Sequence, residues 1–292
     1  MVNPQRYRSL TASIGRVALL ALTLTSCSRV CAEVITVVNS GFENTSGSII
    51  FNEFSFGAPP GWNLYDPNNV TSNGDGPTYF IGTLRPASAP NPTQFFTAGA
   101  TEGQRVGIAF NFANSGGAGE YGFVQTLAAT LQANSIYTLN VDIGNIGSGT
   151  AVNGDFFNLS GFPGYRVDLL AGGSVIAQDI NSIGGTIPNA TFATSTLTFQ
   201  TGATHALLNQ SLGIRLVNLN TIDFTNPTTQ AADLEVDFDN VRFSSVTAVP
   251  EPSSLMLFSV ATICAYRLRR KKTRIFSHGT DNTMSSTSHW CV

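Results

Sequence analysis

The chain has 292 residues and a formal net charge of −3, a small value that conceals a strong asymmetry. Residues 33–247 hold sixteen acidic residues against five arginines and no lysine, a balance of −11, whereas the two flanking segments are basic. An acidic central region repels phosphate backbones, which argues against nucleic acid as a partner and favours cations or neutral sugars.

Cysteine and histidine usage limits what can hold the central region together. The four cysteines are Cys27, Cys31, Cys264 and Cys291, so none lies within residues 33–247, and the one histidine there is His205. No disulfide can cross-link this region, and a zinc site of several imidazoles is excluded. Burial of apolar surface or a bound metal must therefore stabilise it.

Residues 1–32 have the order of a secretory signal peptide. Arginines at positions 6, 8 and 16 precede an apolar run at 17–24, which is too short to span a bilayer core of ~30 Å. Cleavage after Ala32 releases a chain that begins at Glu33 and enters a strand at once. The competing interpretation is a lipobox at 24–27, in which Cys27 is lipidated.

Residues 33–247 predict one all-β domain, because short runs rich in Val, Ile, Phe and Tyr alternate with Gly, Asn, Ser and Thr. No long helical periodicity is present. Apolar and polar residues alternate along 136–143, as expected of a strand with one buried face. The expected strands are 34–38, 105–112, 123–127, 136–143, 165–169, 175–178, 196–199, 212–216 and 234–243. About nine such strands are enough for an antiparallel β-sandwich.

The last predicted strand carries three carboxylates on one face. Glu235, Asp237 and Asp239 alternate with apolar residues, but Val241 and Phe243 have the opposite parity, which predicts a β-bulge near 239–240. Carboxylates two residues apart repel one another unless the face is solvated or a hard cation binds there. The residues alone favour the solvated face over the cation.

Four short motifs of the central region resemble the galactose-binding-like jelly rolls of carbohydrate-binding modules. They are NSGFE at 39–43, PGW at 60–62, GFVQTL at 122–127 and VDFDNV at 236–241. The resemblance implies a jelly-roll fold and a structural calcium ion held by Glu43 and Asp239, although Asn240 stands where the family often has a second Asp. Trp62 and Tyr65 are the candidate ligand-binding aromatics, while the default role of Trp62 is core packing.

No catalytic constellation stands out. Sixteen carboxylates could supply an acid and a base, but their identity depends on distances and surroundings that a sequence does not give. His205 lies in a turn-like segment without a Cys or Gly-x-Ser-x-Gly partner, and the Gly-rich stretch at 115–119 lacks the lysine of a phosphate-binding loop. The sequence therefore predicts no enzyme and no catalytic residue, with a hydrolase as the least favoured class.

Residues 248–272 combine a Pro250-Glu251-Pro252 motif, an uncharged stretch at 255–266 and a basic cluster at 267–272. This order resembles the PEP-CTERM sorting signal, in which Pro-Glu-Pro is recognised by an exosortase. At ~1.5 Å per residue the apolar stretch is too short for a permanent anchor, which favours transient inner-membrane retention before release to the surface or exterior. Residues 273–292 continue as a polar tail, which we expect to be disordered and to which the sequence assigns no role.

The resulting expectation is an exported, non-catalytic protein of the cell surface or extracellular matrix. Its jelly-roll domain is expected to bind carbohydrate or exopolysaccharide. The alternative is a purely structural surface protein without a ligand.

Overall fold

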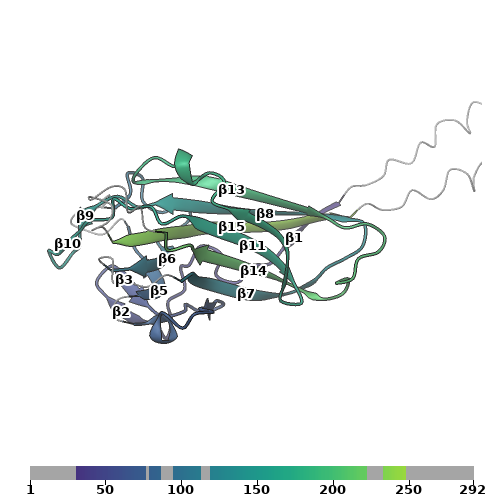
Figure 1. Ribbon diagram of the computed structural model, residues 1–292, viewed down its shortest axis with the longest axis horizontal. Coiled ribbons are helices and arrows are strands. Elements are labelled where there is room, and N and C mark those ends of the chain that lie inside the picture. Colours follow the sequence, from purple (N-terminus) through teal and green to yellow (C-terminus); the bar gives the residue numbers. More distant parts are fainter. Residues whose placement is uncertain (1–30, 77–78, 87–94, 113–118, 222–232, 248–292) are drawn as a thin grey trace, which may run out of the picture. The chain divides into compact units, whose positions relative to one another are not determined.

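The computed structural model describes residues 31–76, 79–86, 95–112, 119–221 and 233–247, and these form two antiparallel sheets packed face to face (Figure 1). The larger sheet has eight strands in the order β13-β8-β15-β6-β5-β3-β2, with β1 paired to the second half of β15. The smaller sheet has five strands in the order β12-β11-β14-β7-β4. The predicted all-β antiparallel sandwich of jelly-roll type is confirmed.

The larger sheet consists of β1 (Cys31–Ile35), β2 (Ile49–Phe51), β3 (Phe54–Phe56), β5 (Tyr79–Leu84), β6 (Val106–Asn111), β8 (Ser135–Asn145), β13 (Thr191–Gln200) and β15 (Leu234–Thr247). The smaller one consists of β4 (Asn63–Tyr65), β7 (Tyr121–Thr130), β11 (Tyr165–Ala171), β12 (Ser174–Ile180) and β14 (Ser211–Asn218). A separate two-stranded hairpin is made of β9 (Gly149–Thr150) and β10 (Phe156–Phe157). The short 3-10 helices are η2 (Ser72–Gly74) and η3 (Gly184–Thr186).

The main hydrophobic core lies between the two sheets, where alternate residues of each strand meet. Leu139, Val141 and Ile143 of β8 enter it from one sheet, and Val167 and Leu169 of β11 enter it from the other. All five are at most 1% exposed. The alternation read from the sequence therefore placed the inward faces of β8 and β11 correctly.

A second hydrophobic core covers the outer face of the larger sheet. It is built from outward residues of β5 and β6 together with side chains from the loops and from the β9–β10 region. Its buried members are Phe80, Leu84, Phe95, Phe96, Val106, Ile108, Phe110, Ile146, Ala151 and Leu159. As a result β5 and β6 are buried on both faces, which explains why their sequences are almost continuously apolar.

The predicted bulge in β15 is confirmed. The register between β15 and β8 shifts between Asp239 and Arg242, and Asn240 has a positive φ of 49°. The extra residue reverses the parity of the strand, so that Phe238 and Val241 both face the main core.

All nine predicted strands are present, with ends that differ by a few residues. The strands that sequence analysis did not anticipate are β2, β3, β4, β5, β9 and β10. Most of these are only two or three residues long, too short to show alternation, and β5 is apolar on both faces. Strand β1 begins at Cys31, which pairs with Thr247, so cleavage after Ala32 would remove the first two of its five residues.

The leader at 1–32 and the tail beyond 247 fall almost entirely outside the described residues. Within the described ranges, no helix has the length and apolar character needed to cross a bilayer.

Candidate functional site

Two carboxyl groups of β15 are buried beneath the second core. Glu235 is 2% exposed and Asp237 is fully buried, and they point to the outer face of the larger sheet, away from Val236 and Phe238. Their strand partners in β6 are Phe110 and Ile108, both members of the second core. Apart from a contact between the two carboxyl groups themselves, both oxygens of Asp237 and one of Glu235 have no hydrogen-bond partner among the described residues.

This environment favours the protonated form of both acids. Burial raises the pKa of Glu235 to about 8, and burial together with the neighbouring Glu235 raises the pKa of Asp237 well above its ordinary value. The two groups are close enough for their titrations to be coupled, so the proton affinity belongs to the pair. We call Glu235 and Asp237 the acid pair.

The solvated strand face that the sequence favoured for these carboxylates is wrong. Loop residues Phe95 and Phe96 and the β9–β10 region cover the face, and alternation along one strand does not reveal such a third layer. Asp239, the next carboxylate along the strand, is also fully buried.

An aromatic pocket of about 230 Å³ opens on the same side of the larger sheet. It is lined by Phe51, Asn52, Phe54, Phe56, Phe80, Phe110, Phe112, Ala151, Asn153, Asp155 and Phe157. Phe51 and Phe112 are about half exposed, at 53% and 46%, whereas Phe80 and Phe110 are buried. The pocket therefore has an accessible aromatic mouth and a buried aromatic floor, and its described lining carries no basic side chain.

Phe110 connects the aromatic pocket with the acid pair. It lines the pocket and is also the cross-strand partner of Glu235, so the two side chains leave the same face of the sheet. The ring centroids of Phe80 and Phe110 are 4.9 Å apart, and Phe157 packs edge-on against Phe110. The pair is therefore separated from the pocket by an aromatic layer, and these side chains must move before a ligand can touch the acids.

A larger groove of about 450 Å³ runs beside β1 and the second half of β15. The one ionisable side chain in its described lining is Arg242, which pairs with Asp142 at 2.9 Å. Because that charge is already engaged and no carboxyl group stands in the described lining, we prefer the smaller aromatic pocket as the functional site.

The sequence-predicted aromatics lie away from both cavities. Trp62 is 4% exposed, stacks on Phe42 with centroids 5.2 Å apart, and donates its indole N–H to the Asn39 carbonyl at 3.0 Å. Trp62 thus occupies the main core, which is the default role expected of it from its sequence context. Tyr65 instead lies on the outer face of the smaller sheet.

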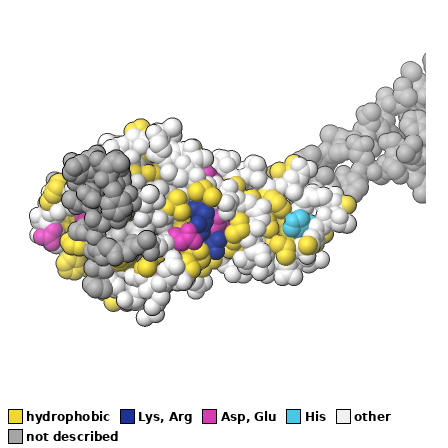
Figure 2. Space-filling model, viewed as in Figure 1, with side chains coloured by type: hydrophobic (Ala, Val, Ile, Leu, Met, Phe, Trp, Pro, Cys, Tyr) yellow, Lys and Arg dark blue, Asp and Glu magenta, His cyan; other side chains and the backbone are white. Residues whose placement is uncertain are grey.

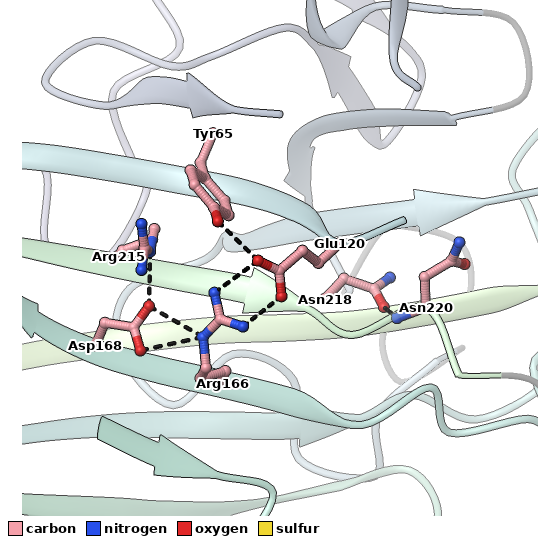
Figure 3. A network of polar contacts seen from close by, with 7 residues as sticks. All are labelled: Tyr65, Glu120, Arg166, Asp168, Arg215, Asn218 and Asn220. Atoms are coloured by element: carbon pink, nitrogen blue, oxygen red, sulfur yellow. Dashed lines mark hydrogen bonds and ion pairs between the residues drawn. The ribbon is translucent and has the colours of Figure 1, made fainter. Parts of the chain in front are cut away.

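Tyr65 belongs to a network of polar contacts on that outer face, seen close by in Figure 3 and as a charged patch among apolar side chains in Figure 2. Its hydroxyl donates to Glu120 at 2.7 Å, and Arg215 lies 4.3 Å from its ring centroid. Arg166 pairs with both Glu120 and the buried Asp168, and Arg215 donates to Asp168 at 2.6 Å. Two cations and two anions balance here, as in a structural ion-pair network.

Glu43 and Asp239 meet the same loop, at residues 101–105. One Asp239 oxygen accepts hydrogen bonds from the Thr101 and Glu102 amides at 2.7 and 2.8 Å, and Glu43 accepts from the Gln104 and Arg105 amides at 2.6 Å. Burial raises the pKa of Asp239 to about 6 in spite of these bonds. In the part of the chain that the structure describes, no three acidic, histidine or cysteine side chains converge as metal ligands would.

Fold and site together define a class of protein: a jelly-roll sandwich with buried carboxyl groups of raised pKa behind an aromatic pocket, an arrangement suited to acid chemistry on an apolar molecule. The particular family follows from the comparisons with known proteins. Residues 33–244 match the family model of the HpiC1 cyclase, and the chain belongs to this HpiC1-like family.

Solved structures agree with this family. A cyclase from Fischerella sp. TAU is 36% identical and has a TM-score of 0.59, covering 75% of this chain and 100% of that chain. A Stig cyclase from the same source, with the same scores and coverage, was solved in complex with (3Z)-3-(1-methyl-2-pyrrolidinylidene)-3H-indole. A third structure, 37% identical over the same shares and with the same TM-score, holds 4-(1H-indol-3-yl)butan-2-one. Among curated proteins, none matches this chain.

Family membership corrects the functional expectation from the sequence. A non-catalytic carbohydrate-binding or purely structural protein is contradicted, because the family and its solved members are cyclases. The short jelly-roll motifs predict the fold and not the function, because catalytic and non-catalytic proteins share this fold. Nothing supports a carbohydrate or exopolysaccharide ligand.

The sorting signal is confirmed. Residues 248–271 match the PEP-CTERM protein-sorting motif, which is a substrate signal for an exosortase. Export and transient membrane anchoring through this segment follow, and the Pro250-Glu251-Pro252 motif itself lies outside the described residues.

Sequence reasoning missed the aromatic pocket and misread the acid pair. A usable signal was present: the chain has 20 phenylalanines, and those of the site cluster as FNEF at 51–54, FF at 95–96 and FF at 156–157. Paired aromatics outside the predicted strands are more than a single sandwich core needs, and here they build a second apolar layer.

Proposed function

We propose that this protein is a cyclase that closes a ring in an apolar, indole-bearing substrate by acid catalysis from the acid pair. The observation that carries the proposal is the burial of Glu235 and Asp237 behind an aromatic pocket, which raises the pKa of both carboxyl groups and so favours their protonated forms. The assignment to a family of cyclases supplies the reaction class.

The chemistry needs no co-reactant. A neutral carboxyl of the pair donates its proton to a carbon–carbon double bond of the substrate, and the electrons of that bond form the new C–H bond. A second π-system attacks the resulting cation to close the ring, and loss of a proton to the carboxylate restores the acid. Substrate and product therefore have the same mass. The surrounding phenylalanines exclude water that would otherwise quench the cation.

The aromatic pocket sets the class of substrate. Rings such as Phe80 and Phe110 offer faces and edges for stacking against a planar aromatic group. The indole compounds bound to the Fischerella cyclases are of this kind. Because the described lining carries Asp155 and no basic side chain, a substrate with a carboxylate or phosphate is disfavoured.

A turnover assay tests the proposal. Purified protein is incubated with a panel of indole-bearing alkenes, and products of unchanged mass and new retention time are detected by liquid chromatography and mass spectrometry. Asp237→Asn should lower turnover by at least ~100-fold, while Tyr65→Phe, on the opposite sheet, should leave it unchanged. Equal activity of Asp237→Asn and the wild type would remove the acid pair from the mechanism.

We further propose a structural calcium ion between β15 and the segment that connects β1 with β2, held by Asp239 and Glu43. Its support is the chemistry of the two donors: the carboxylates of Glu43 and Asp239, from distant parts of the chain, both accept amides of loop 101–105, and backbone oxygens or water would have to complete the ligand shell. Bound calcium would tie this loop to β15. Melting temperature should rise with calcium and fall with chelator in the wild type, and Asp239→Asn should lose the difference; superimposable wild-type melts would exclude the ion.

The surface or exterior is the proposed destination of the mature protein. After exosortase processing within residues 250–252, the domain would leave the inner membrane. Fractionation of cells that express the wild type and a Glu251→Ala variant tests this, with the variant expected to stay in the membrane fraction. Retention of both proteins in the membrane fraction would contradict release.

A further inference from the structure

Glu53 holds the two hairpins that wall the aromatic pocket together. It is the second residue of the two-residue turn between β2 and β3. Its two neighbours in the chain, Asn52 and Phe54, line the pocket. Its Oε1 accepts the amide N–H of Val152, at the tip of the β9–β10 hairpin, at 2.8 Å. Ala151 and Asn153, on either side of Val152, line the opposite wall.

The turn that carries Glu53 is fixed to the body of the protein. The Glu53 carbonyl accepts the Arg85 amide at 2.8 Å and the Arg105 guanidinium at 3.4 Å. The β9–β10 tip, by contrast, closes mostly on itself: Ala151 and Gly154 donate to carbonyls of residues 155 and 151. The other hydrogen bonds that residues 151–155 make within the described ranges also stay inside the tip. The contact with Glu53 is thus the polar link from the tip to the fixed wall.

The Glu53 carboxylate is an unusual choice for a link of this kind. The residue is 3% exposed, and its second oxygen, Oε2, has no hydrogen-bond partner among the described residues. A buried carboxylate oxygen without a donor is destabilising, and hydration of the group on opening would relieve that cost. The closed arrangement is therefore held by one charge-assisted bond and opposed by the desolvation of the same group.

We propose that Glu53 is a positioning residue of the site, which clasps the β9–β10 hairpin over the aromatic pocket and sets how fast an aromatic ligand leaves. This inference rests on the proposed function for the identity of the ligand. Phe157 belongs to β10 of this hairpin. Its ring centroid lies 6.0 Å from that of Phe54 and 6.2 Å from that of Phe110. Release of the tip therefore loosens the aromatic layer between the pocket and the acid pair.

The test compares Glu53→Ala with Glu53→Gln in the full-length protein. The glutamine oxygen can still accept the Val152 N–H, so this variant should restore most of the effect that alanine removes. Asp66→Ala is the matched control, because it removes a carboxylate that accepts the Val70 and Thr71 amides outside the pocket. The two readouts are hydrogen exchange over residues 149–157 and the dissociation rate of 4-(1H-indol-3-yl)butan-2-one.

Glu53→Ala should speed exchange of the Val152 amide and raise the dissociation rate of the indole ketone about tenfold, as expected for loss of a hydrogen bond to a charged group. Should that variant not fold, Glu53→Asp gives the same comparison, since its shorter side chain withdraws the carboxylate. Unchanged exchange at residue 152, or a dissociation rate no faster than that of Asp66→Ala, would overturn the clasp. If the wild type does not bind the ketone, the proposed substrate class fails, and hydrogen exchange still decides the role of Glu53.

Discussion

Asp237 lies directly opposite Gly144 in the ladder between β15 and β8, and this glycine leaves the space in which the acid is buried. A Cβ atom built on Gly144 would lie 2.8 Å from the Asp237 Cβ, 2.9 Å from the Phe96 ring and 2.6 Å from the Phe192 ring. Phe96 and Phe192 stack with centroids 4.2 Å apart over this position. The absence of a side chain at residue 144 thus lets an aromatic lid close over a carboxyl group.

Gly144→Ala should destabilise the protein by about 1–3 kcal/mol, because the added methyl group overpacks the space between two rings and Asp237. Urea denaturation followed by circular dichroism measures the loss. Gly185→Ala is the matched control, since nothing lies within 4 Å of a Cβ at that position, and it should change stability by no more than about 0.5 kcal/mol. Equal stability of the two variants would contradict the close packing over Asp237.

Activity should depend on the protonated acid pair. Burial raises the pKa of Glu235 to about 8, so kcat/KM should be level below that pH and fall about tenfold per pH unit above it. Glu235→Gln should shift the falling limb, because the two titrations are coupled. A rate that instead rises with pH would show that the pair acts as a base.

Stability should fall as pH rises across the same range. A carboxyl whose pKa is raised on folding stabilises the protein below its unfolded-state pKa, and this contribution is lost as pH rises through the folded-state pKa. For Glu235 the window runs from 4.5 to about 8. The loss should be on the order of a few kcal/mol, measured by denaturant unfolding at pH 5 and pH 8.

Glu235→Gln and Asp237→Asn should flatten this pH dependence. Asp66 and Asp179 have a lowered pKa in the folded protein, so their contribution to stability is lost only as pH falls below 4.5. They therefore do not mask the loss of stability expected between pH 5 and pH 8. Identical slopes for the wild type and both variants would mean that the pair is ionised in the folded protein.

Asp168 should matter for stability and not for ligand binding. It is fully buried between Arg166 and Arg215, so Asp168→Asn leaves two guanidinium groups facing a neutral amide. We expect a loss of about 3 kcal/mol by chemical denaturation. Affinity for the indole ketone, measured by calorimetry on the folded variant, should stay within about twofold of the wild type. A large fall in affinity without loss of stability would move the functional site to this sheet.

How much could be predicted from the sequence differs between the fold and the site. Alternation along 136–143 and 165–169 places β8 and β11 with their inward faces, and the parity change after Phe238 gives the bulge at Asp239. Strands of two or three residues, such as β9 and β10, carry too few positions for any periodicity. They could be found only by their pairing, and the hairpin that they make supplies one wall of the pocket through residues 151–157.

The site was harder to predict from the sequence than the fold, because it depends on the second hydrophobic core that covers the outer face of the larger sheet. Glu235 and Asp237 alternate with apolar residues, as they would on a solvent-exposed strand face. Nothing in the neighbouring sequence shows that this face is instead buried. Trp62 and Tyr65 were singled out as candidate ligand-binding aromatics, yet the first lies in the main core and the second joins an ion-pair network. The phenylalanines that make the pocket come from four separate segments of the chain.

The sequence by itself determined the PEP-CTERM tail, the acidic charge of the central region and the antiparallel sandwich, because each depends on composition or on residues close together in the chain. The export leader stays a prediction from the same kind of local pattern. Only the tertiary structure decided that Phe95 and Phe96 cover the outer face of the larger sheet and that Phe96 closes over Asp237. The proton affinity of a carboxyl group depends on the water around it, and burial by residues distant in sequence is what removes that water.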